Sequence, residues 1–152
     1  MGFYIVGSEP GDDDNTRWHP TGLRIFTNRD PNEVSRILDL EPTQVKKVPR
    51  GRGWESVWLW ETGVDDTESF DRHVEEFMTT FQPRATRVRE LASTCRVELR
   101  AGYAAAHGQG GITLAPDLVV LLAEMGAGIC LDLYPPTPDH PMDLNADLMS
   151  PT

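Results

Sequence analysis

Basic residues are scarce in this sequence. It contains 14 lysines and arginines against 24 aspartates and glutamates, which gives a formal net charge of −10. Proteins that bind nucleic acids in general place clustered Lys and Arg against the phosphates, so this balance argues against a nucleic-acid partner. The excess of acid suits a protein whose partner is basic.

Long apolar runs and cysteines are scarce as well. No stretch approaches the roughly 20 apolar residues that a membrane helix needs, and the first residues lack the pattern of a secretory signal. We therefore expect a cytoplasmic protein without a membrane partner. The two cysteines, Cys95 and Cys130, fall within expected strands, where we expect buried, reduced thiols.

The sequence signatures of common catalytic sites are missing. The chain has no GxxxxGK[ST] phosphate loop, no HExxH or CxxC metal pattern and no GxSxG nucleophile motif. The histidines His19, His73, His107 and His140 are scattered, and His73 is expected on the polar side of a helix. We predict no catalytic residue, no metal ligand and no cofactor. An enzyme of an unrecognised class stays open as an alternative.

Length and composition predict one globular domain. The chain has 152 residues, of which 39% are hydrophobic, and this is typical of a single folded unit. We expect a flexible lead-in, a single α+β domain and a Pro-rich mobile tail, over residues 1–21, 22–135 and 136–152.

The periodicity of apolar residues predicts strands that interleave with helices. Strands are expected at 23–27, 44–48, 56–61, 95–103, 112–114 and 129–134. Helices are expected at 31–40, 70–82 and 116–126, with a short helical piece within 84–94. The order predicts an α+β fold with a mainly antiparallel sheet and helices packed on one face. It follows the ferredoxin-like βαββαβ order, extended by a further β-α-β.

The strand expected at 95–103 alternates most clearly. Its apolar set, Cys95, Val97, Leu99, Ala101 and Tyr103, is predicted to face the core. Its other set, Arg96, Glu98, Arg100 and Gly102, is expected to face water. In the strand at 56–61, Trp58 and Trp60 lie opposite Val57 and Leu59, which indicates that both faces are covered or that one is a contact surface.

Positive charge is concentrated in one loop. The candidate ligand- or partner-binding residues are Lys46, Lys47, Arg50, Arg52 and Trp54, with Gly51 and Gly53 among them. Such a loop can hold an anion or an acidic partner. The alternative is a solvated hairpin connection whose cations offset the acidic segment that follows.

That acidic segment covers residues 55–83, which hold eight acids and one base. Its candidate partner-binding residues are Asp66, Glu68, Glu75 and Glu76. We expect these carboxylates at the start and on the solvent face of a helix, where they create a field complementary to a basic partner.

Three segments of the chain resemble a known bacterial family. They are Leu23 to Thr43 with its Asp30-Pro31 helix start, the glycine loop and Trp strand from Arg50 to Trp60, and the closing helix and strand from Leu114 to Tyr134. The pattern is similar to that of domain of unknown function 4279, over residues 22–135. The resemblance implies the fold. It implies no enzymatic activity and no catalytic residue.

We therefore expect a non-catalytic protein-interaction module, with immunity or antitoxin proteins as a model for a small acidic domain that masks a basic surface. The main alternative is a sensor domain that binds a small anion or metabolite through the basic loop at 46–54. Unpaired sheet edges also make a homodimer an alternative.

Overall fold

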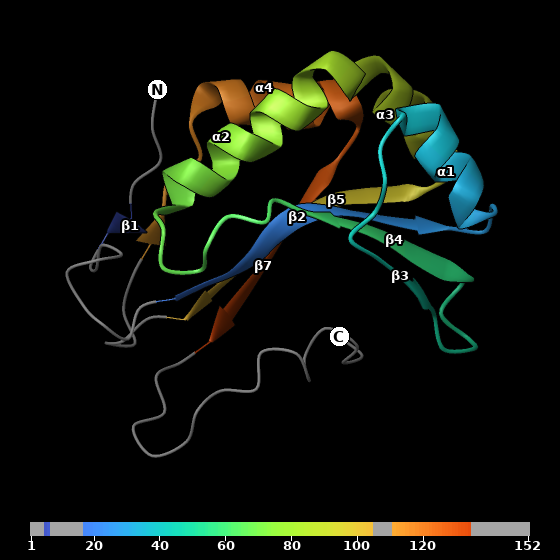
Figure 1. Ribbon diagram of the computed structural model, residues 1–152, viewed down its shortest axis with the longest axis horizontal. Helices are drawn as coiled ribbons and strands as arrows, with labels where there is room; N and C mark the ends of the chain where they lie inside the picture. Colours follow the sequence, from blue (N-terminus) through green and yellow to red (C-terminus); the bar gives the residue numbers. More distant parts are fainter. Residues whose placement is uncertain (1–4, 7–16, 105–110, 135–152) are drawn as a thin grey trace.

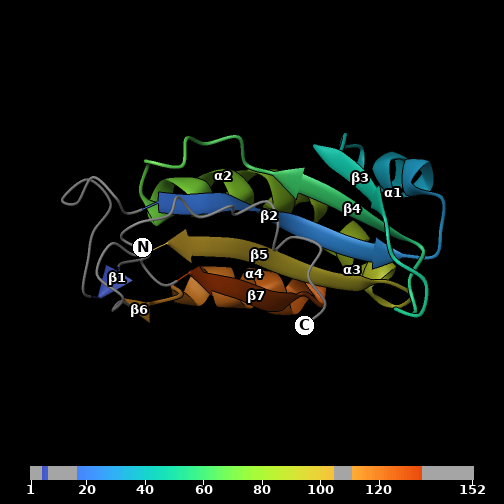
Figure 2. The same ribbon diagram turned by 90° about the horizontal axis from the view of Figure 1, so that it is seen from below.

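The fold is a β-sheet with a layer of helices on one of its faces (Figures 1 and 2). The computed structural model describes residues 5–6, 17–104 and 111–134. Within these residues the architecture is α+β, as predicted. The predicted mobile tail at 136–152 and most of the predicted lead-in lie outside the described residues.

The helices begin and end close to the expected positions. They are α1 (Pro31–Leu38), α2 (Phe70–Phe81), α3 (Ala85–Ala92) and α4 (Pro116–Met125), with a 3-10 turn η1 (Gln82–Arg84) between α2 and α3. The strands are β1 (Ile5–Val6), β2 (Arg17–Thr27), β3 (Gln44–Lys47), β4 (Ser56–Glu61), β5 (Arg96–Ala104), β6 (Gly111–Ile112) and β7 (Gly128–Tyr134). Strand β2 starts at Arg17, earlier than the alternation that begins at Leu23 had indicated.

The large sheet has the strand order β3-β4-β2-β5-β7. Its pairs β3–β4, β4–β2 and β2–β5 are antiparallel, but β5 and β7 are parallel. A parallel pair needs a crossover connection, and helix α4 lies in the connection between these two strands. The sheet is therefore mixed. Strand β6, which was expected to belong to it, pairs with β1 in a separate two-stranded sheet.

The core lies between the sheet and the helices. The apolar set of β5 is buried there as predicted, together with Trp58 and Trp60 of β4. The ring of Trp60 meets that of Phe81 edge-on, with centroids 5.1 Å apart. The indole N–H of Trp58 donates to Ser35 Oγ at 3.0 Å, so its polar atom is satisfied on burial.

Local side-chain contacts define the ends of helix α1. The Asp30 side chain accepts from the Asn32 N–H at 2.9 Å and caps the amino-terminal end, as the Asp-Pro start predicts. At the other end, the Arg84 guanidinium donates to the carbonyls of Leu38 and Asp39 at 2.8 and 3.0 Å. Because Arg84 lies in η1, it joins the end of α1 to the turn that follows α2.

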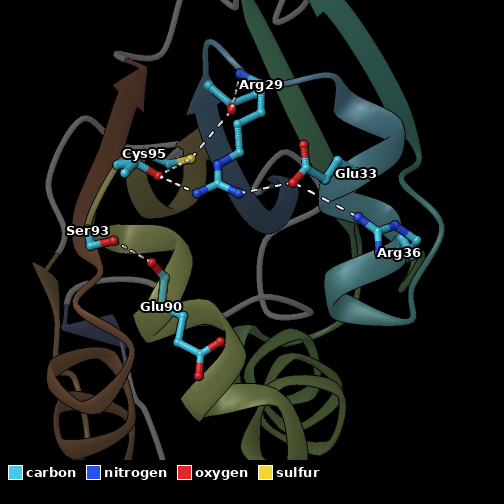
Figure 3. A network of polar contacts seen from close by, with 8 residues as sticks. Arg29, Glu33, Arg36, Glu90, Ser93 and Cys95 are labelled. Carbon is cyan, nitrogen blue, oxygen red and sulfur yellow. Dashed lines mark hydrogen bonds and ion pairs between the residues drawn. The ribbon is translucent and has the colours of Figure 1, made fainter.

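Arg29 connects three segments at the end of β2 (Figure 3). Its guanidinium donates to Glu33 of α1 and to the Thr94 hydroxyl just before β5, each at 3.2 Å. The buried Cys95 thiol lies 3.4 Å from Thr27 Oγ1, and both Cys95 and Cys130 are free thiols. These contacts fix the positions at which the two central strands begin and end.

Candidate functional site

Charged side chains line the sheet face that carries no helix in the described part of the chain. Cross-strand partners share a face of a sheet, and Arg24 pairs in register with Glu98 and Leu59. Arg100 and Glu61 lie on the same face, because each pairs with Gly22. We call this surface the helix-free face (Figure 1).

A network of charges occupies the middle of the helix-free face. Glu98 of β5 accepts from Arg24 Nε at 2.8 Å and from Arg24 Nη2, and its second oxygen lies 3.3 Å from Arg96 Nη2. Arg24 and Arg96 both lie over the ring of Phe26, at 5.1 and 5.4 Å from its centroid. Glu98 is therefore engaged by two arginines that the aromatic ring holds in place.

Arg100 lies one step further along β5 and is the most enclosed cation described. Only 1% of its surface is exposed, although the alternation of β5 had indicated a residue that faces water. Its Nη2 lies 2.9 Å from Asp132 Oδ2 of β7. The N–H directions do not point at that oxygen, so Arg100 Nε and Nη2 have no hydrogen-bond acceptor within the described residues. Because hydrogen bonds weaken steeply when misaligned, this ion pair satisfies neither donor.

Gly22 separates Arg100 from Glu61 on this face. A Cβ atom at Gly22 would lie 1.9 Å from the carbonyl oxygen of Trp60, so the close approach of the two strands requires glycine. No side chain therefore stands between Glu61 and Arg100. Burial raises the pKa of Glu61 above its ordinary value, while the charges of Arg100 and Lys46 oppose that shift.

No sequence motif marks the residues of the helix-free face as a candidate site. Arg24, Glu61 and the pair Glu98 and Arg100 fall on three separate stretches of alternating sequence, and no local motif joins them. The signal that was present is the alternation of β5, which placed Arg96, Glu98 and Arg100 on one face. Alternation shows which face a residue is on, but it does not show how deeply that residue is buried.

His73 is buried within α2, which corrects the expectation that it lies on a polar face. Only 1% of its surface is exposed. Its Nε2–H donates to the backbone carbonyl of Asp65 at 3.1 Å, which leaves Nδ1 to accept from the Thr62 hydroxyl at 3.1 Å. Burial lowers the pKa of His73, more than the Asp65 carbonyl and nearby carboxylates raise it. His73 thus ties the β4–α2 connection to the helix as a neutral ring.

The basic loop is a hairpin connection between β3 and β4. Lys46 lies on the helix-free face, and Lys47 points to the opposite face because side chains alternate along a strand. Arg50 and Arg52 are exposed at the loop, and Trp54 is half-buried. The Asn28 side chain accepts from the Glu55 N–H at 2.9 Å and supports the loop from β2. The structure therefore does not bring the four cations together on one face.

The acidic candidates lie at the other end of strand β4. Asp66 and Glu68 follow β4, Glu75 and Glu76 lie on α2, and all four are exposed. Glu75 forms an ion pair with Arg72 at 3.1 Å. The six residues of β4 place roughly 17 Å between the basic loop and the acidic connection, so pairing between them is not favoured.

The two outer strands of the large sheet differ in character. Strand β3 carries Lys46 and Lys47, and strand β7 carries neither lysine nor proline. The exposed large apolar side chains among the described residues are Val45 of β3, Val119 and Val120 of α4, and Ile129 and Leu133 of β7. Exposed apolar surface is therefore concentrated at the α4–β7 edge, by which we mean α4 together with β7.

Two classes of site receive no support from the residues that the structure describes. Among them, no group of three or more His, Cys, Asp and Glu side chains could hold a metal ion. Within the same residues, no helix has both the length and the apolar character needed to cross a membrane.

Comparison with known proteins gives one family. The family model described as domain of unknown function (DUF4279) matches residues 17–136, which is most of the chain. No curated protein and no solved structure matches the chain.

Proposed function

We propose that this chain, which belongs to the DUF4279 family, is a non-catalytic protein-interaction module that associates through the α4–β7 edge. The observation that carries the proposal is the contrast between the two outer strands of the sheet. Lysines on an outer strand discourage pairing with another strand, and β3 has two of them. Strand β7 lacks this protection and exposes 42% of Ile129 and 70% of Leu133.

A second copy of this chain is the occupant that the edge fits best. Asp132 is the one charged residue in β7. If two β7 strands pair antiparallel about Leu131, each Asp132 lies opposite Cys130 of the second copy, so the two carboxylates are not placed directly opposite each other. Such pairing is self-complementary, as twofold interfaces must be. It would also cover Ile129 and Leu133 with the same residues of the second copy.

Analytical ultracentrifugation over a range of protein concentrations tests this association. The wild-type chain is expected to sediment as a dimer that dissociates on dilution. Ile129→Lys places a charge on β7 and is expected to give a monomer. Val45→Lys is the matched control, because Val45 is also an exposed, branched apolar residue on an outer strand. This variant should leave the dimer intact. A monomeric wild type, or equal effects of both variants, would overturn the proposal.

A basic protein is the second candidate partner, in a masking role of the immunity or antitoxin type. This role is favoured by four carboxylates that are exposed on the side away from the basic loop, those of Asp66, Glu68, Glu75 and Glu76. The test is capture of partners at low salt by the wild type and by a variant with all four residues changed to lysine. A basic protein lost only with this variant would support the role. A variant with Lys46, Lys47, Arg50 and Arg52 changed to glutamate is the control.

We also propose that the segment from β2 to β5 is a ferredoxin-like unit. Its elements follow the order β-α-β-β-α-β when η1 and α3 are counted with the second helix. The spatial order β3-β4-β2-β5, with antiparallel pairs throughout, supports this relationship. Strand β7 then extends the unit on the side of β5.

A further inference from the structure

The guanidinium of Arg100 presents a donor edge that no described residue fills. Nε–H and Nη2–H lie on the same side of the planar group and form the fork that a carboxylate accepts with two parallel hydrogen bonds. Both atoms are buried and lack an acceptor. A buried donor left without an acceptor is costly, and more so when the group is charged. Such a group is expected to gain an acceptor in the state in which the protein functions.

The neighbouring carboxylates cannot complete this edge. Glu98 is already engaged by Arg24 and Arg96. Asp132 approaches Nη2 to 2.9 Å but is misaligned, and it leaves Nε unpaired. Glu61 belongs to β4, two strands away, and the distance across two strand spacings is roughly 10 Å. No carboxylate among the described residues therefore fills this edge, which leaves the fork available to an acceptor from another molecule.

Gly22 is the neighbour of Arg100 on strand β2. It lies in register between Glu61 and Arg100 and contributes no side chain. An acceptor that approaches Arg100 from the side of β2 therefore meets no side chain at this position of the strand.

We propose that Arg100 binds the carboxylate of a small ligand on the helix-free face. A carboxylate fits better than a phosphate because Glu61 and Asp132 flank the fork, and a second negative charge on the ligand would be repelled by both. On this face the described basic side chains exceed the acidic ones by one. They are Arg24, Lys46, Arg96 and Arg100 against Glu61, Glu98 and Asp132. Among the described side chains this balance favours a ligand with a single negative charge.

Nuclear magnetic resonance of the Arg100 Nε–H group tests the proposal in the full chain. Acetate, succinate and inorganic phosphate are titrated in turn, with sodium chloride at matched ionic strength as the control. A saturable shift of this resonance with acetate is expected, with weaker responses to succinate and phosphate because each carries additional negative charge. Absence of a saturable shift, or an equal response to chloride, would overturn the proposal.

Two variants separate the fork from a general effect of charge. Arg100→Lys keeps the charge but cannot form the two parallel hydrogen bonds, so acetate should no longer cause saturable shifts in the backbone amides around Gly22. Asp132→Asn keeps the fork and removes a competing charge, so acetate should bind about threefold to tenfold more tightly. If Arg100→Lys fails to fold, Asp132→Asn alone decides, because unchanged or weaker binding contradicts the proposal.

The carboxylate could belong to a free acid or to the end of a peptide chain. A tetrapeptide with a free C-terminal carboxylate and the same peptide with a C-terminal amide distinguish these sources. Binding of the free-acid peptide but not of the amide supports a chain terminus. Binding of acetate but of neither peptide supports a small acid. Equal binding of both peptides would overturn recognition of a carboxylate.

Discussion

Arg24 and Glu98 face each other across the two central strands β2 and β5, with Arg24 Nε donating to Glu98 Oε1 at 2.8 Å. Little of either side chain is exposed. A pair of this kind is costly to break from one side, because removal of one partner leaves the other charge buried and alone. The pair therefore stabilises the helix-free face as a unit.

A double-mutant cycle measures that coupling. We expect Arg24→Met and Glu98→Met each to lower the free energy of unfolding by about 3 kcal/mol. The double variant should cost less than the two single variants together, by about 1–3 kcal/mol, because neither charge is then left without its partner. Urea denaturation of the four proteins provides the measurement, and strictly additive effects would contradict the account.

Gly22→Ala should strongly destabilise the fold. Its Cβ atom would overlap the Trp60 carbonyl oxygen, which belongs to the backbone and cannot move without shifting β4. We expect a loss of about 3 kcal/mol or more, comparable to severe overpacking. Gly128→Ala is the matched control, because no atom lies within 4 Å of the added Cβ, and its effect should be within about 0.5 kcal/mol. Thermal unfolding of both variants is the measurement.

Stability should fall in mild acid because of His73. Burial lowers the pKa of His73 in the folded chain, so the unfolded chain binds its proton more readily. This contribution is fully present above the ordinary histidine pKa of about 6.5 and is lost as the pH falls below it. His73→Gln should lose less stability than the wild type between pH 7.5 and pH 5.5. Equal losses, measured by chemical denaturation at both pH values, would contradict the assignment.

The ionisation of Glu61 should make stability depend on pH in the opposite direction. Burial raises the pKa of Glu61 when the chain folds, so its stabilising contribution is present below the ordinary glutamate pKa of about 4.3 and is lost as the pH rises. Glu61→Gln should therefore be more stable than the wild type at pH 7. The difference should vanish near pH 4. Glu76→Gln, a change at an exposed carboxylate of α2, is the control and should alter stability little at either pH.

Local sequence patterns predicted most of the elements of the fold. The alternation from Cys95 to Tyr103 identified both the strand and its core face, and the stripe from Phe70 to Phe81 identified α2. These patterns succeed because one face of each element packs against the same core. The direction of β7 was not predictable in this way, because the same apolar pattern is compatible with a parallel and with an antiparallel neighbour.

The candidate sites were harder to predict because they depend on contacts between distant residues. His73 was assigned to the polar face by its residue type, but hydrogen bonds to Thr62 and Asp65 allow it to be buried. Arg100 was expected to face water, and its burial follows from tertiary structure that no local pattern encodes. The basic loop was conspicuous in the sequence, yet alternation along β3 divides Lys46 and Lys47 between two faces.

Amide hydrogen exchange of strand β7 tests the central claim, association through the α4–β7 edge, most directly. The amides of β7 that point away from β5 should exchange slowly at high protein concentration and faster on dilution, because a second copy protects them only in the dimer. The outer amides of β3 should exchange rapidly at every concentration. Outer amides of β7 that exchange as rapidly as those of β3, whatever the concentration, would contradict the account.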